Sequence, residues 1–210
     1  MNRVKSLPLI AVCLALATSA SAITVTGPFV GTLQEDFESV TPVYHVPSVT
    51  VMGGELTISS PSSLVGVYQG GWGLGDKGSL NAGSTTIGFG NDGNSATYSF
   101  NFTNAVTDFG GYWNTAWIGS SLDLAFYDAG NNLLGTDSWI TPNNNILNWR
   151  GWSSSVGIAR IDVLPGNHLS NESIAFDNLQ ANVAAAPDSG ATAALLGLAL
   201  VGLAALRRKS

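Results

Sequence analysis

The sequence predicts an all-β ectodomain, an antiparallel β-sandwich of jelly-roll type, between an N-terminal signal peptide and one C-terminal transmembrane helix. Apolar and polar residues alternate over 96–103 and again over 122–127, which is the period of half-buried strands. Clusters of Gly, Asn and Ser separate such segments, and no amphipathic stretch of helical length precedes Pro187. Many short strands at this spacing favour an antiparallel sandwich.

Residues 1–22 have the composition of a secretory signal peptide. Arg3 and Lys5 give a positive start, and residues 7–17 are apolar. Ala20-Ser21-Ala22 has the small-x-small form that signal peptidase recognises. We therefore expect cleavage after Ala22 and export of the rest of the chain.

Strand candidates follow one another through residues 23–179, the expected ectodomain. They cover 43–51, 55–59, 85–89, 96–103, 105–112, 122–127, 133–136, 156–163 and 173–179. The sequence Asp128-Ala129-Gly130-Asn131-Asn132 predicts a turn that joins two of them into a hairpin. Glycine-rich residues 69–84 predict a long loop, and alanine-rich residues 180–185 predict a linker.

The charge balance excludes nucleic acid as a partner. Eight basic residues stand against fourteen acidic ones, for a net charge of −6, so no basic patch is available for phosphates. Only Lys77, Arg150 and Arg160 lie outside the terminal segments, which makes the ectodomain strongly acidic. The single cysteine excludes a disulfide framework and a cysteine zinc site.

Asp177 is the first candidate for a metal ligand. Alternation places Ala175, Asp177 and Leu179 on one strand face, so the carboxylate has apolar neighbours and is expected to be partly buried. A buried charge must be paired or bound to metal. One hypothesis is a structural calcium held by Asp177 with Glu38 or Asp36. The alternative is a carboxylate that accepts backbone N–H bonds or pairs with Arg160.

The six tryptophans suggest either glycan binding or core packing. Sugar rings stack on exposed indoles, and Trp149-Arg150-Gly151-Trp152, expected in a loop, is the best candidate. Arg150 would hydrogen-bond hydroxyls or a uronate carboxylate. The alternative is that these tryptophans fill the core and cover its edge.

The sequence predicts no enzyme. His45 lies in an expected strand and His168 in an expected turn, and no Gly-x-Ser-x-Gly elbow occurs. The neighbouring acids Glu35, Asp36 and Glu38 could support glycoside hydrolysis. Adjacent acids at the start of a strand are more often solvated, so a hydrolase is the weaker alternative.

The C-terminus carries the most specific pattern of the chain. Residues 191–206 contain no charge and end at the basic residues Arg207, Arg208 and Lys209. As a helix they would span about 24 Å at 1.5 Å per residue, close to the thickness of a bilayer core. The basic end would stay cytoplasmic. The polar motif Pro187-Asp188-Ser189-Gly190 stands just before this helix.

Residues 186–210 resemble the PEP-CTERM class of sorting domains, in its VPDSG-CTERM variant, with Ala186 in place of the usual valine. The resemblance implies processing by an exosortase-like enzyme of a Gram-negative bacterium. Asp36-Phe37-Glu38 and Ile174-Ala175-Phe176-Asp177-Asn178-Leu179 resemble the ends of lectin-like and carbohydrate-binding-module-like sandwiches. That resemblance implies neighbouring first and last strands and a calcium-ligating acid on the last strand.

These observations predict an exported protein, tethered to the inner membrane as a precursor and then placed at the cell surface or in the extracellular matrix. Its expected partners are signal peptidase, an exosortase-like enzyme and the membrane. The expected role of the ectodomain is structural or adhesive. The alternatives are a lectin-like module for exopolysaccharide and, with less support, a small glycan hydrolase.

Overall fold

The computed structural model describes residues 23–60, 65–69, 85–89, 98–115, 121–142, 147–163 and 174–184. The expected signal peptide, the C-terminal segment 186–210 and the glycine-rich stretch 70–84 lie outside these ranges. Across the described ranges, no helix is long and apolar enough to span a bilayer.

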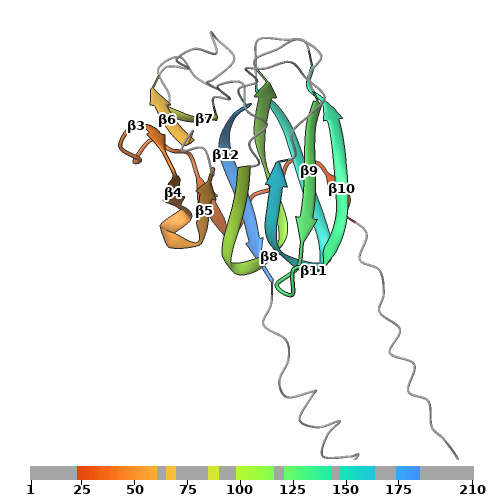
Figure 1. Ribbon diagram of the computed structural model, residues 1–210. Helices are drawn as coiled ribbons and strands as arrows, with labels where there is room; N and C mark the ends of the chain where they lie inside the picture. The colour runs from red at the N-terminus through yellow and green to blue at the C-terminus, as the bar shows by residue number, and fades with distance from the viewer. Residues whose placement is uncertain are drawn as a thin grey trace, which may run out of the picture.

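Two layers of antiparallel strands form a sandwich, which confirms the predicted fold class (Figure 1). The first layer contains β4 (Ser48–Val51), β5 (Leu56–Ser59), β9 (Ser121–Tyr127) and β10 (Leu133–Ile140). The second contains β1 (Thr24–Thr26), β2 (Leu33–Glu35), β3 (Val43–Val46), β6 (Val65–Gln69), β7 (Thr85–Phe89) and β12 (Ile174–Val183). A short 3-10 turn, Met52–Gly54, joins β4 to β5.

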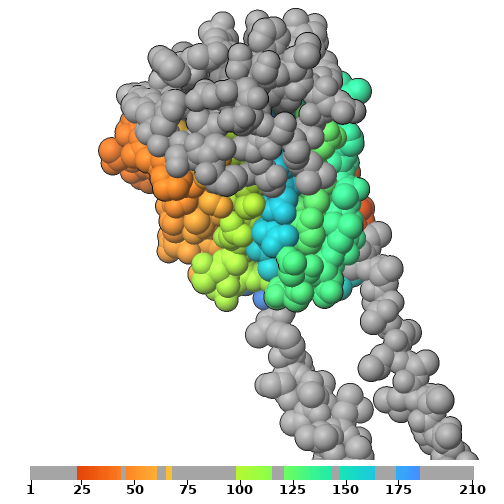
Figure 2. All heavy atoms as spheres, viewed as in Figure 1, coloured from red at the N-terminus to blue at the C-terminus, as the bar shows by residue number. Residues whose placement is uncertain are grey.

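Two long strands, β8 (Tyr98–Thr115) and β11 (Asn148–Val163), belong to both layers. The first half of β8 pairs with β5, and its second half pairs with β12. The second half of β11 pairs with β9, and its first half pairs with β1. The β8–β11 ladder shifts register between Ser153 and Ile158, where both strands pass from one layer to the other. Figure 2 shows the outer surface of the first layer, with β4 and β5, β8, β11 and β9 side by side.

Aromatic side chains fill the space between the layers. Phe100 of the first layer contacts Phe109, Trp113 and Phe176 of the second, with ring centroids 5.2 to 5.7 Å apart. Phe126 contacts Trp152 at 5.4 Å in the same way. All of these rings are buried, and tilted or edge-on aromatic pairs add to the free energy that burial of their area provides.

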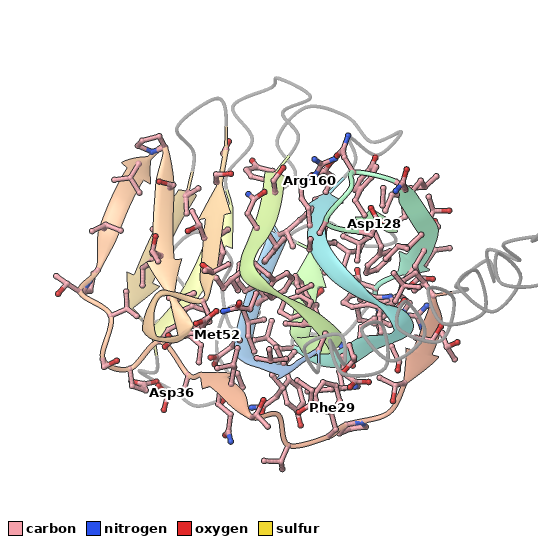
Figure 3. The ribbon with its side chains drawn as sticks, turned by 90° about the horizontal axis from the view of Figure 1, so that it is seen from below. Phe29, Asp36, Met52, Asp128 and Arg160 are labelled. Carbon is pink, nitrogen blue, oxygen red and sulfur yellow. The ribbon has the colours of Figure 1, made fainter. Side chains whose placement is uncertain are left out.

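The chain between β1 and β2 crosses the outside of the second layer. β1 pairs with β11 and β2 pairs with β12, while β8 lies between these two partners. Residues 27–32, here called the crossing segment, therefore pass over β8. Figure 3 shows Phe29 of this segment and Asp36 beyond it on the side opposite Asp128 and Arg160.

Several local predictions need correction. Residues 98–103 of the expected strand 96–103 and the expected strand 105–112 are parts of the single strand β8, because β5 and β12 pair with its successive halves; residues 96 and 97 lie outside the described ranges. Residues 149–152, predicted as a loop, belong to β11. Of the expected linker 180–185, residues 180–183 belong to β12, and the Ala184 N–H donates to Ala105 O at 2.8 Å. The predicted pairing of the first and last strands is wrong in detail, because β1 pairs with β11 and it is the second strand, β2, that pairs with the last strand, β12.

A β-bulge at Asn178 changes the predicted faces of β12. Asp177 pairs with Tyr112 and Gln180 with Gly110, so two residues of β12 oppose only Gly111. Asn178 has φ +49°, a left-handed conformation that Asn tolerates better than most residues. Leu179 therefore points into the core and not, as predicted, to the face of Asp177. Gln180, by contrast, lies on the outer face.

Candidate functional site

The crossing segment and the outer face of the second layer border an open groove of about 620 Å³, here called the outer groove. Its lining residues are Pro28, Phe29, Val30, Tyr112, Trp149, Asn178 and Gln180. A polar recess of about 370 Å³ adjoins it and shares Asn178 and Gln180; it is also lined by Gln34, Glu35, Asp36, Ser39 and Gly53. Volumes of this size are typical of small-ligand sites.

Two glycines determine where Trp149 lies. A Cβ on Gly110 would stand 2.8 Å from the Trp149 ring, and one on Gly151 would stand 3.1 Å from the Trp149 Nε1. The indole therefore packs directly on glycine backbone of β8 and β11, where any larger residue would displace it. Its Nε1 donates to Thr26 O at 3.2 Å, and this hydrogen bond fixes the orientation of the ring on the glycine backbone.

Two further aromatic rings stand perpendicular to Trp149. Phe29 of the crossing segment lies 5.5 Å away at 87°, and Tyr112 of β8 lies 5.4 Å away at 78°. Both also line the outer groove. The groove thus presents a rigid aromatic corner assembled from three separate parts of the chain.

Amide side chains hold the crossing segment against β12. The Gly31 N–H donates to Gln180 Oε1 at 2.9 Å, and Gln34 Nε2 donates to Gly31 O at 3.1 Å. The Thr32 N–H donates to Asn182 Oδ1 at 3.0 Å. These hydrogen bonds join the crossing segment to β12, so the fold holds both sides of the groove in place.

Gly31→Ala is expected to lift the crossing segment. A Cβ at Gly31 would lie 2.5 Å from Ala181 O and 2.6 Å from Ala181 N, and backbone atoms cannot yield as side-chain ends do. We expect a loss of about 1–3 kcal/mol, as for other overpacked sites, measured by urea denaturation. Gly27→Ala is the control, because nothing lies within 4 Å of its Cβ position. Equal stability of the two variants would contradict this packing.

Asp108 anchors the outer face beneath the crossing segment. Its carboxylate accepts hydrogen bonds from Ser153 Oγ at 2.8 Å, Thr107 Oγ1 at 2.8 Å and Asn182 Nδ2 at 3.2 Å. Burial raises the pKa of Asp108, but these three hydrogen bonds outweigh it and hold the pKa below its ordinary value of 3.8.

Asp108 is therefore expected to stabilise the fold in a pH-dependent way. A depressed carboxyl pKa contributes stability above the unfolded pKa of 3.8, and the contribution disappears as pH falls through the folded pKa. The melting temperatures of the parent and of Asp108→Asn should differ at pH 6 and converge as the pH falls below 3.8. A difference that stays constant over this range would show that the carboxylate charge plays no part.

The predicted calcium ligands are Asp177 with Glu38 or Asp36. Among the side chains described, no three His, Cys, Asp or Glu residues cluster as a metal site would require. Asp177 is buried, 1% exposed, and its Oδ1 accepts the Asn178 N–H at 2.7 Å, as the backbone alternative predicted. Asp36 is exposed, and its Oδ1 accepts the Glu38 N–H at 3.1 Å. The calcium site stays a prediction.

The predicted glycan-binding residues lie on two opposite faces of β11. Trp149 lines the outer groove. Trp152, three positions on in the same strand, is 0% exposed in the core, so its predicted role in sugar stacking is wrong and the core alternative is right. Arg150 points away from the groove and forms an ion pair with Asp137 at 2.7 Å.

Of the residues that line the groove, sequence reasoning singled out only Trp149 and missed the other six: Pro28, Phe29, Val30, Tyr112, Asn178 and Gln180. The glycines Gly110, Gly111 and Gly151 were the available signal, because glycine inside a strand often marks a close approach of another group. No local pattern shows that residues 27–32 cross β8, since this depends on pairings far apart in sequence.

Comparison with known proteins identifies the C-terminal segment. Residues 187–210 match the VPDSG-CTERM motif, including the predicted Pro187, Asp188, Ser189 and Gly190. The chain is therefore an exported protein that carries a C-terminal sorting motif. No curated protein matches the chain in sequence.

Three solved structures are similar to the sandwich. A carbohydrate-binding module, TmCBM61, in complex with β-1,4-galactotriose is 14% identical, covering 61% of this chain and 88% of its own, with a TM-score of 0.42. A family 6 carbohydrate-binding module is 19% identical, covering 60% of this chain and 87% of its own, with a TM-score of 0.37. The active domain of bacteriophage CBA120 tailspike protein 4 is 14% identical, covering 79% of this chain and 20% of its own, with a TM-score of 0.31. Similarity at these TM-scores says nothing about the ligand of this chain.

Proposed function

We propose that this chain is a non-catalytic, exported surface protein whose ectodomain attaches to exopolysaccharide through the outer groove. The observation that carries the proposal is the fixed aromatic corner of Trp149, Phe29 and Tyr112 beside the amide-bearing residues Asn178 and Gln180. Aromatic rings suit the C–H faces of sugars, and side-chain amides both donate to and accept from hydroxyl groups.

The state of the nearby carboxylates supports a binding role over hydrolysis. Glu35 Oε1 accepts the Phe37 N–H and Glu35 Oε2 accepts the Met52 N–H, both at 2.9 Å. Asp36 Oδ1 accepts the Glu38 N–H. Glu35 is thus occupied with holding two backbone segments, whereas a glycosidase needs a pair of carboxyl groups directed at the sugar.

The sorting proposal also includes the location of the protein in the cell. We place the chain first in the inner membrane of a Gram-negative bacterium, with residues 191–206 as the tether. An exosortase-like enzyme then releases the ectodomain to the cell surface or matrix. Mass spectrometry of the mature protein tests this step, because a surface-located protein that retains residues 191–210 would indicate a permanent anchor instead.

Trp149→Ala is expected to weaken polysaccharide binding at least tenfold. The test uses the full-length protein in mild detergent, with affinity electrophoresis against a panel of neutral and acidic polysaccharides. Trp139→Ala is the matched control, because Trp139 lies on β10 of the first layer and is not part of the groove. Binding that survives Trp149→Ala would place the glycan site elsewhere, and a parent protein that binds no polysaccharide would remove the proposal.

A further inference from the structure

The outer groove carries a charge pattern that restricts its ligand. Within the described ranges, Arg150 and Arg160 are the only Arg or Lys side chains, and neither lines the groove or the adjoining recess. An acidic sugar is ordinarily held by Arg or Lys, so the positions of these two arginines bear on which glycans the groove can hold.

Arg150 is fully engaged on the other side of β11. Its Nε and its Nη2 donate to the two carboxylate oxygens of Asp137 at 2.7 to 2.9 Å. The guanidinium also lies over the Trp139 ring, 5.5 Å from its centroid. Since Trp149 precedes it by one residue, the two side chains point to opposite faces of the strand. Arg150 therefore cannot meet a uronate in the groove without breaking the ion pair.

Arg160 belongs to the opposite layer. It donates to Asn131 Oδ1 at 2.6 Å, pairs with Asp162 at 3.0 Å and stacks on Tyr127, 4.1 Å from the ring centroid. Figure 3 shows it on the far side of the sandwich from Phe29 and Asp36. It contributes nothing to recognition in the outer groove.

The recess next to the groove is acidic. Glu35 and Asp36 both line it, and the two backbone N–H donors on Glu35 hold that carboxylate in place. An anionic group on a sugar seated across Asn178 and Gln180 would face two carboxylates and, among the described lining side chains, no cation. Like charges brought together in this way act against binding and so provide selectivity.

We infer that the outer groove selects uncharged polysaccharide and rejects glycans that carry uronate, sulfate or phosphate groups. The inference rests on the proposed function and adds the class of ligand to it. Neutral sugars lose nothing to the acidic recess, because they carry no charge for the carboxylates to repel.

Matched pairs of polysaccharide test this inference. Soluble glucan, galactan and mannan are each compared with the same polymer after oxidation of its C6 hydroxyls to carboxylates, using full-length protein in mild detergent. We expect at least one neutral polymer to bind and its carboxylated form to bind at least tenfold more weakly at low salt. The difference should shrink at 1 M salt, where the screening length is roughly 3 Å.

Asp36→Asn shows whether the recess causes the selectivity. The side chain is exposed, and the amide keeps the Oδ1 acceptor for the Glu38 N–H, so the fold should be unchanged. We expect the variant to bind carboxylated polymer several-fold better while its affinity for the neutral polymer stays the same. A carboxylated polymer that binds the parent as well as its neutral form overturns the inference and leaves the proposed function standing. Failure of every polymer to bind overturns the proposed function itself.

Discussion

Trp152→Ala is expected to lower the free energy of unfolding by about 3–5 kcal/mol, the range for a large aromatic residue removed from a core. The Trp152 ring is fully buried and lies 5.4 Å from Phe126 and 5.8 Å from Trp113. Its Nε1 donates to Asp137 Oδ2 at 2.8 Å, so truncation removes a hydrogen bond together with the packing. Urea denaturation followed by circular dichroism measures the change.

Trp149→Ala is the matched comparison, because it removes the same side chain from the opposite face of the same strand. The Trp149 ring is only partly buried and packs on glycine backbone. We expect Trp149→Ala to lower the free energy of unfolding by about 1–2 kcal/mol, less than half the effect of Trp152→Ala. We also expect this variant to lose polysaccharide binding. Similar costs for the two variants would show that the strand faces are assigned wrongly.

Trp149 and Trp152 also show why the fold class could be predicted from the sequence while the outer groove could not. Alternation predicted the strands over 98–103 and 122–127 correctly, because each such segment buries one face whatever its partner is. Residues 148–155 gave no such pattern. Gly151 and the three serines after Trp152 have the composition of a loop, yet β8 pairs with this segment and makes it a strand.

The groove depends on features that act over long distances in the sequence. Leu33–Glu35 pairs with Leu179–Ala181, and this pairing carries residues 27–32 across β8. The bulge at Asn178 depends on the close approach of Gly111, whose Cβ position lies 2.7 Å from the Leu179 side chain. A period-two pattern cannot reveal a bulge, because one extra residue reverses every face that follows.

Asp137→Ala is expected to cost about 2–4 kcal/mol, somewhat below the cost of breaking a fully buried ion pair. The Arg150 and Asp137 side chains are 21% and 15% exposed, so solvent screens the pair only in part. Removal of the carboxylate leaves the Arg150 guanidinium and the Trp152 Nε1 without their acceptor. Urea denaturation of the single variants and of an Asp137→Leu/Arg150→Met double variant measures the effect.

The double variant separates the ion pair from its packing. When both charges are replaced by apolar groups of similar size, no unpaired charge remains, and much of the lost stability should return. Arg150 O also accepts the Trp113 Nε1 at 3.1 Å, so this part of β11 stays fixed by its backbone in the double variant. Because Trp149 precedes Arg150 on that fixed backbone, polysaccharide affinity should be close to that of the parent. Strictly additive losses in the double variant would mean that the two side chains do not act as a pair.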